Sequence, residues 1–202
     1  MPNAVPICLD TQDTEEIIKT VVNIAPAFGG INLEDISAPR CFEIETRLKE
    51  LLDIPVFHDD QHGTAIVVLS GIINALKVVN KEKENCKVIV NGAGSAGIAI
   101  TKLLLRYGFK DVTLCDKSGI LSKNSKDLNW MQKEMMEVTN LSGKEGSLAD
   151  AFVDADIFVG VSAPGIVTEE MVASMNRDGI LFAMANPVPE IMPDLAKKAG
   201  AK

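Results

Sequence analysis

The chain has 202 residues, an apolar fraction of 47% and a net charge of −8 at pH 7. This length accommodates one large domain or two small ones, and the apolar fraction is ordinary for a globular protein with a full core. The acidic balance argues against nucleic acid or an anionic membrane as a partner. Because no run of about 18 apolar residues occurs, we expect no transmembrane span, and the first residues lack the pattern of a signal peptide.

The cysteines, which are Cys8, Cys41, Cys86 and Cys115, lie far apart in the sequence and form no CxxC pair. They stand in apolar or periodic segments, which favours buried free thiols over disulfides or a zinc site. Free thiols are typical of a reducing compartment, so we expect a cytoplasmic protein.

The N-terminal part of the chain mixes short apolar runs with amphipathic stretches. The runs predict strands, and apolar residues at helical spacing predict helices; the strands are expected at 5–9, 29–36 and 54–57, and the helices at 11–25 and 39–52. Asp13 and Thr14 are candidate caps of the first helix, and Pro39 would lie in the first turn of the second. Residues 63–79 predict a helix that is apolar nearly all round, which we expect to be buried between layers.

A polar stretch, NKEKEN at 80–85, is the clearest change of composition and a candidate domain boundary, although the preceding helix could belong to either side. Beyond it, strands alternate with helices: strands at 87–91, 112–116, 157–161 and 179–185, and helices at 96–107, 128–138, 147–152, 168–175 (capped by Thr168) and 193–199. This alternation predicts an α/β fold with a doubly wound, Rossmann-like parallel sheet and right-handed crossovers.

A glycine-rich loop joins the first strand of this alternation to the helix after it. Gly92, Gly94 and Gly97 fit GxGxxG in its required context of strand, turn and helix. Gly92 would permit the tight turn, Gly94 would let a pyrophosphate approach the backbone, and Gly97 would let the helix pack on the strand. The predicted cofactor-binding loop is Gly92, Ala93, Gly94, Ser95, Ala96 and Gly97. The alternative is a glycine-rich turn with a packing role only.

An acidic residue, Asp116, ends the next strand and would accept hydrogen bonds from both ribose hydroxyls, which favours NAD over NADP. Lys117 follows at once and could tolerate a 2′-phosphate, so NADP stays an alternative. Two later strand ends also suit a ligand, because ligands bind outside the carboxyl ends of such strands. Ser162 in the loop after one strand is a candidate cofactor residue. Asn186 could point at substrate or nicotinamide, or could instead close its own turn.

Two acidic pairs, Glu34-Asp35 and Asp59-Asp60, each follow an apolar run in the N-terminal part. Adjacent parallel strands would bring these ends together, and the converging carboxylates would repel unless a cation neutralised them. Mg²⁺ or Mn²⁺ fits, because both prefer oxygen ligands. Since adjacent residues on a strand point opposite ways, only one of Asp59 and Asp60 is expected to bind metal. The alternative is two solvated loops with helix-capping acids.

Taken in order, several long segments closely resemble the malic enzymes, nearest to the short bacterial and archaeal form. These are GGINLEDI, IPVFHDDQHGTA, VIVNGAGSAG, GVSAPG and FAMANPVPE. The resemblance implies oxidation of malate with NAD or NADP, followed by decarboxylation of bound oxaloacetate to pyruvate. It implies that residues 1–62 are the C-terminal remnant of an α/β substrate- and metal-binding domain, and that 63–202 form the NAD(P)-binding Rossmann-like domain. The implied site residues are Glu34, Asp35 and Asp60 for the metal, Asp59 beside the catalytic lysine, Ala93 to Ala96 for the cofactor phosphates, and Asn186 for substrate.

The chain departs from the family pattern in its proton-transfer groups. The family's general acid is a tyrosine in a YTP motif and its base is a lysine, both upstream of the segment that begins this chain. The single tyrosine, Tyr107, is in no such motif, and Lys19 is the only lysine before the first acidic pair. A downstream asparagine-rich substrate loop is absent as well. We therefore expect a malic enzyme truncated at both ends, whose parent is a homodimer and whose own malate turnover is negligible.

Two other functions are compatible with the sequence. One is a non-catalytic dinucleotide-binding module, and the missing tyrosine and lysine favour it unless a partner chain supplies them. The other is a Rossmann dehydrogenase of the amino-acid or folate type. The paired acidic clusters weigh against that one, because such enzymes need no carboxylate metal site.

Overall fold

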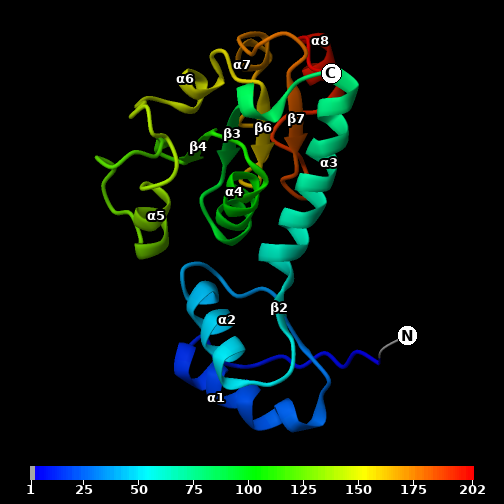
Figure 1. Cartoon of the computed structure of the whole chain (residues 1–202), viewed down its shortest axis with the longest axis vertical. Coiled ribbons are helices and arrows are strands. Elements are labelled where there is room, and N and C mark those ends of the chain that lie inside the picture. Colours follow the sequence, from blue (N-terminus) through cyan, green and yellow to red (C-terminus); the bar gives the residue numbers. More distant parts are fainter. Residues whose placement is uncertain (1–2) are drawn as a thin grey trace. The chain divides into compact units, whose positions relative to one another are not determined.

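The computed structural model of the chain describes residues 3–202. The chain divides into one compact unit that ends at Asp59 and a second unit, Asp60–Lys202 (Figure 1). The family resemblance implied a boundary after residue 62, whereas composition pointed to residues 80–85. The long helix before that polar stretch belongs to the second unit, so residues 80–85 do not separate the two units.

The first unit pairs two helices with a small parallel sheet. Its elements are α1 (Thr14–Ile24), a 3₁₀ turn η1 (Ala25–Ala27), β1 (Ile31–Leu33), α2 (Arg40–Leu51) and β2 (Val56–His58). The strands run parallel, with Leu33 opposite His58. The apolar stripes of the helices pack with the strands into a core of Ile17, Ile18, Val21, Leu33, Ile44, Leu48 and Val56. This packing, rather than strand length, stabilises the unit, because three-residue strands cannot persist alone.

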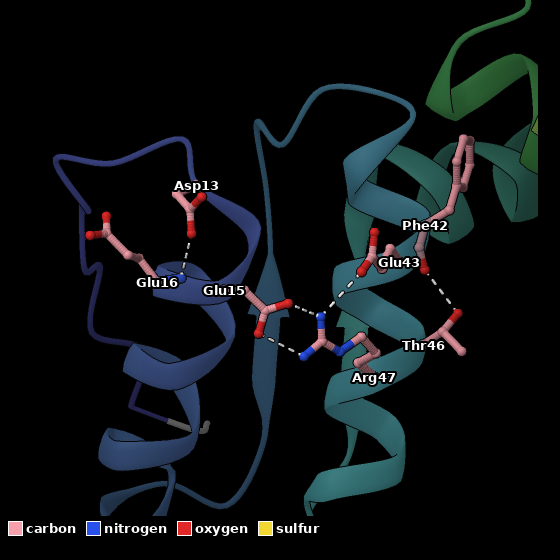
Figure 2. Close-up of polar contacts among 7 residues, drawn as sticks. All are labelled: Asp13, Glu15, Glu16, Phe42, Glu43, Thr46 and Arg47. Atoms are coloured by element: carbon pink, nitrogen blue, oxygen red, sulfur yellow. Dashed lines mark hydrogen bonds and ion pairs between the residues drawn. The ribbon is translucent and has the colours of Figure 1, made fainter. Parts of the chain in front are cut away.

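Polar contacts at the surface align α1 with α2 (Figure 2). Arg47 of α2 donates to Glu15 of α1 through both terminal nitrogens, with Nη2 to Oε2 at 2.8 Å, and Nη1 also contacts Glu43 at 3.1 Å. Asp13 caps α1 by accepting a hydrogen bond from the backbone N–H of Glu16 at 2.9 Å, as the sequence predicted. Exposed ion pairs contribute little free energy, so we assign Arg47 an aligning role.

Two predictions for this unit are wrong. Residues 5–9 do not form a strand: Val5 is 63% exposed and Ile7 is 49% exposed, and the segment pairs with no other strand of the described residues. Alternating apolar residues make a strand only where a partner accepts the backbone hydrogen bonds. Pro39 stands at the N-cap of α2 instead of in its first turn.

The second unit is built on a five-stranded sheet in the order β5-β4-β3-β6-β7. Its strands are β3 (Lys87–Asn91), β4 (Asp111–Asp116), β5 (Gly119–Ile120), β6 (Ile157–Gly160) and β7 (Ile180–Ala183). Its helices are α3 (Thr64–Val79), α4 (Ser95–Tyr107), α5 (Trp130–Met135), α6 (Leu148–Phe152), α7 (Glu169–Ala173) and α8 (Pro193–Lys198). The π-helical turn η2 (Asp59–Gly63) precedes α3, and the 3₁₀ turn η3 (Lys83–Asn85) precedes β3.

The predicted doubly wound parallel sheet is confirmed, with strands running outward from β3 in both directions. Only β5, which the sequence did not predict, is antiparallel. Successive side chains of a strand face opposite sides. Ile89, Cys115 and Phe158 therefore share a core with α6, α7 and α8. Helix α4 packs on β3 and β4, and α3 packs against α4.

Helix α3 differs from the expectation that it would be buried all round. Its buried residues form one stripe, Ala65, Val68, Ile72 and Leu76, whereas Val67 is 70% exposed and Val78 is 75% exposed. By length and composition alone, the helical stretch Asp59–Val79 could cross a membrane, but a core helix of a soluble protein passes the same test. The absence of a transmembrane span therefore stays a prediction.

Free thiols are confirmed for all the cysteines, but Cys8 is exposed and not buried as predicted. Its segment is the one that does not form a strand, so no layer covers the side chain. Burial raises the pKa of Cys86 to about 11 and that of Cys115 to about 12. These buried thiols are therefore inert packing groups.

A buried carboxylate fixes the edge of the sheet where β3 and β6 begin. Asp156 is 7% exposed and accepts hydrogen bonds from Lys81 Nζ at 2.8 Å, the Lys87 N–H at 2.9 Å and Asn176 Nδ2 at 3.2 Å. Burial opposes ionisation of Asp156, but the bonds from Lys81 and Lys87 outweigh it and lower the pKa. The linker after α3 is thereby attached to the start of β6.

Replacing this carboxylate should destabilise the chain in a pH-dependent way. Asp156→Asn is expected to lower the free energy of unfolding by about 1–3 kcal/mol near neutral pH, because buried donors lose their acceptor. Because the pKa of Asp156 is lower in the folded state, its ionised form stabilises the folded chain at pH values above the unfolded pKa of about 3.9. This contribution is lost as the pH falls through the folded-state pKa. Urea unfolding across a pH series should show the two chains converging in acid. Asp178→Asn, at a partly exposed ion pair, is the control. An Asp156→Asn effect that is independent of pH would contradict this assignment.

Candidate functional site

The glycine-rich loop follows β3 and turns sharply into α4. Gly92 has a φ of 115°, and a Cβ there would lie 2.5 Å from the carbonyl oxygen of Val161. A Cβ at Gly97 would collide with the carbonyl oxygen of Gly92. Only glycine fits at these two positions, because the first needs a left-handed conformation and the second a close approach of helix to turn.

Gly94 stands at the outer face of the same loop. It is exposed, and no atom lies within 4 Å of where its Cβ would be. Helix α4 starts at Ser95 and its first helical backbone bond runs from the Ile98 N–H to the Gly94 carbonyl. The N–H groups of the first turn are therefore available to an anion, which the helix dipole also favours.

A side chain from α5 supports this loop, and the sequence reasoning missed it. Gln132 Nε2 donates to the carbonyl of Ala93 at 3.2 Å. Gln132 is itself fixed by a reciprocal capping box with Asn129. The N-x-x-Q spacing at the helix start was the available signal for the cap, but nothing in the sequence linked it to residue 93.

The loops after β3 and β6 meet at the point where the strand order reverses. β3 and β6 are parallel neighbours. The strand after β3, which is β4, lies on one side of this pair, and the strand after β6, which is β7, lies on the other. Asn91, which is buried, donates through Nδ2 to the Ser162 hydroxyl at 2.7 Å, and the Val161 N–H donates to the Asn91 carbonyl at 2.9 Å. Ligands of doubly wound sheets bind in the crevice at this switch point.

The predicted ribose acceptor lies at the same edge of the sheet. Asp116 ends β4, and Cys115 before it pairs with Asn91 at the end of β3. Asp116 Oδ1 accepts hydrogen bonds from the Ser118 N–H at 2.7 Å and the Ser118 hydroxyl at 2.6 Å. Both bonds involve the same oxygen, and among residues 3–202 Oδ2 accepts no hydrogen bond.

The end of β7 brings an unpredicted carboxylate to this edge. Asn186, which follows β7, is exposed. Glu190, four positions later, is completely buried and accepts a hydrogen bond from the Ser162 N–H at 3.0 Å. The available sequence signal was Gly160 at the end of a strand, because a glycine there leaves room for a neighbouring side chain.

The acidic pairs of the N-terminal part follow paired strands. Because Leu33 is in register with His58, Glu34 and Asp59 emerge at the same ends of β1 and β2. Asn32 Nδ2 donates to Glu34 Oε1 at 2.8 Å, a contact that the sequence did not suggest. Asp35 adopts a left-handed φ of 58°, a conformation that Asp tolerates better than most residues.

Two expectations about these acids change. Asp59 and Asp60 lie in the π-helical turn η2 and not on a strand, so strand alternation does not decide which of them would bind metal. Asp60 also belongs to the second unit. Among residues 3–202, no group of three or more His, Cys, Asp or Glu side chains is arranged to hold a metal ion. The predicted ligand set Glu34, Asp35 and Asp60 therefore stays a prediction.

Two single substitutions in the glycine loop should differ sharply in stability. Gly97→Ala is expected to lower the free energy of unfolding by about 1–3 kcal/mol, because its Cβ overlaps the Gly92 carbonyl. Gly94→Ala adds the same methyl group to open space at a φ of −94°, so its effect should stay within about 1 kcal/mol. Urea unfolding of both variants measures the difference. Equal stability of the two variants would mean that the loop does not pack as described.

Comparisons with known proteins agree with this architecture. Residues 61–194 match the family described as "Malic enzyme, NAD binding domain", and residues 8–49 match "Malic enzyme, N-terminal domain". The crystal structure of an NAD-dependent malic enzyme from Thermotoga maritima superimposes with a TM-score of 0.95 at 49% identity, over 98% of this chain and 53% of that one. The α/β fold with a Rossmann-like domain is thus confirmed by a solved relative.

Curated relatives point to the same family. An NAD-dependent malic enzyme from Geobacillus stearothermophilus is 59% identical over 96% of this chain and 41% of its own length. A bifunctional malic/malolactic enzyme from Bacillus subtilis is 54% identical over 98% of this chain and 49% of its own. The chain thus spans about half the length of these relatives, or somewhat less. Since the NAD-binding family covers more than half of its residues, the chain belongs to the malic enzyme family.

Proposed function

We propose that this protein takes part in the metal-dependent oxidative decarboxylation of malate to pyruvate and CO₂, with reduction of NAD or NADP. The observation that supports this most directly is the meeting of the glycine loop, Gly92 to Gly97, with the Ser162 loop at the switch point of the sheet. Membership of the malic enzyme family supplies the reaction. Relatives named as NAD-dependent and as NADP-dependent both match the chain.

The cofactor would be held by backbone and side-chain groups at one edge of the sheet. The N–H groups at the start of α4 would bind the pyrophosphate, Asp116 the ribose, and Ser162 the nicotinamide end. Asn186, exposed after β7, would bind the substrate. Asp116 favours NAD, while the exposed Lys117 beside it leaves NADP as the alternative.

A divalent cation, Mg²⁺ or Mn²⁺, would orient the substrate and polarise its C2 oxygen when bound. The ligands that the family resemblance implies are Glu34, Asp35 and Asp60, and Asp59 directly precedes Asp60 in the sequence. The chemistry of the donors fits, because carboxylate oxygens suit both ions. The paired ends of β1 and β2 support the grouping of Glu34 with Asp59.

The 202 residues themselves are expected to bind cofactor with negligible malate turnover. Tyr107, the only tyrosine, ends α4, with its ring tilted against that of Phe109 and Lys83 over its face. It lies 12 positions after Ser95 along the helix, which is about 18 Å at 1.5 Å per residue. It is therefore at the far end of α4 from the glycine loop, and this observation favours the second candidate, a dinucleotide-binding module without catalysis of its own. We further propose a cytoplasmic protein whose full-length form is a homodimer, with no nucleic-acid or membrane partner.

Calorimetric titration with NADH, with and without Mn²⁺ and malate, tests the proposal. The chain is expected to bind NADH, and Gly94→Ala is expected to weaken binding by about tenfold or more while remaining folded, because its methyl occupies the approach of the pyrophosphate. A malate-dependent NADH assay should show no turnover. Failure to bind either NAD or NADP would refute the cofactor assignment, and robust turnover would refute the account of the missing acid and base.

The nucleotide preference should depend on Asp116. Asp116→Ser is expected to weaken NAD binding by about 10- to 100-fold, because hydrogen bonds to a charged acceptor are lost. NADP binding should change by no more than about threefold, because the carboxylate does not favour a 2′-phosphate. Parallel titrations with both nucleotides measure this, and an equal loss for both would remove Asp116 from the ribose site.

A further inference from the structure

A carboxylate buried behind the proposed site joins the loop after β6 to the end of β7. Glu190 is 0% exposed. Its Oε1 accepts hydrogen bonds from the Ser162 N–H at 3.0 Å and the Ser162 hydroxyl at 3.4 Å, and its Oε2 accepts one from the Ala185 N–H at 3.0 Å. Among residues 3–202 it forms no ion pair, so these donors alone compensate its burial.

The surrounding backbone is shaped to hold this side chain. Gly160, the last residue of β6, lies so close that a Cβ there would be 2.5 Å from the Glu190 carboxyl carbon. The Val167 N–H donates to the Glu190 carbonyl, and the Gly165 N–H donates to the Pro189 carbonyl, each at 3.0 Å. The loop after β6 is therefore attached to the segment after β7 along both backbone and side chain.

Through the Ser162 hydroxyl, Glu190 is also linked to the central strand, β3. Asn91 at the end of β3 donates to the same Ser162 hydroxyl. Ala185, held by Oε2, directly precedes Asn186. One buried carboxyl group thus connects the ends of β3, β6 and β7, and the residues proposed to contact cofactor and substrate lie on the segments that it connects.

We propose that Glu190 is a positioning residue: its carboxylate holds the Ser162 loop and the Asn186 segment in the arrangement that binds the dinucleotide. This inference rests on the proposed function of the site. A glutamine would not replace it, because an amide offers one acceptor oxygen and presents its NH₂ group to a backbone N–H. The arrangement therefore depends on two acceptor oxygens and not on the size of the side chain.

The test combines amide hydrogen exchange with NADH titration on the 202-residue chain. In the wild type, the N–H groups of Ser162 and Ala185 should exchange far more slowly than other exposed loop amides, because a buried carboxylate accepts both. Glu190→Gln should increase exchange at both positions and raise the NADH dissociation constant by about tenfold, because the binding-ready arrangement is less populated. Glu137→Gln, which removes an exposed charge, is the matched control and should change neither.

Gly160→Ala provides a second route to the same effect without a change in charge. Its methyl would displace the carboxylate, so it should weaken NADH binding as Glu190→Gln does. In a Glu190→Ala background, where the space is vacated, Gly160→Ala should cause no further loss, and this non-additivity reports direct coupling. A purely additive loss would overturn the proposal.

The outcomes separate this inference from the proposed function. Wild-type NADH binding with unchanged affinity in Glu190→Gln would overturn the positioning role and leave the proposed function intact. If the wild-type chain did not bind NADH, the proposed function would be refuted. The coupling would still be supported if the Ser162 and Ala185 amides were protected in the wild type and lost that protection in Glu190→Gln. Rapid wild-type exchange at both amides would overturn the coupling even if every variant failed to fold.

Discussion

The close approach of two backbone loops at the switch point of the sheet is the constraint on which the rest of the second unit depends. Gly92 lies against the carbonyl of Val161, and Gly97 lies against the carbonyl of Gly92. These contacts bring the start of α4 directly to the ends of β3 and β6. The exposed anion site at the helix start follows from this packing, because it aims the free N–H groups outward.

Carboxylates in this chain lie in three different surroundings, and each surrounding suits a different role. Asp156 lies at the amino ends of the strands and is compensated by Lys81, so it stabilises the fold. Glu190 lies at the carboxyl ends and is compensated only by N–H and hydroxyl donors, so it organises loops. Glu34 and Asp59 are exposed at strand ends, and the proposed divalent cation would be their counter-charge. Residue type alone does not separate these roles, whereas burial and hydrogen-bond donors do.

Features that are local in sequence were predictable. The alternation of strands and helices after residue 86 predicted the parallel sheet, and the spacing of Gly92, Gly94 and Gly97 predicted a strand–turn–helix. The caps Asp13 and Thr168 were found because a cap is decided by neighbours within one helical turn.

Features that depend on distant contacts were not predictable. Residues 5–9 look like a strand but have no partner, and β5 is too short to give a periodic signal. Helix α3 is apolar all round, yet only one stripe is covered. The role of Glu190 depends on Ser162 and Gly160, which are nearly thirty residues away in the sequence; a single acid in an apolar, proline-rich stretch does not reveal that contact.

The proposed dinucleotide would bind across the ends of β3, β4 and β6. The most direct test is to assign the backbone amides by NMR and follow them during titration with NADH. This binding mode predicts that the largest shifts occur at residues 92–97, near Asp116 and at Ser162, with little change around Asp156 at the opposite edge of the sheet. Shifts concentrated around Asp156, or spread without a focus at the glycine loop, would contradict it.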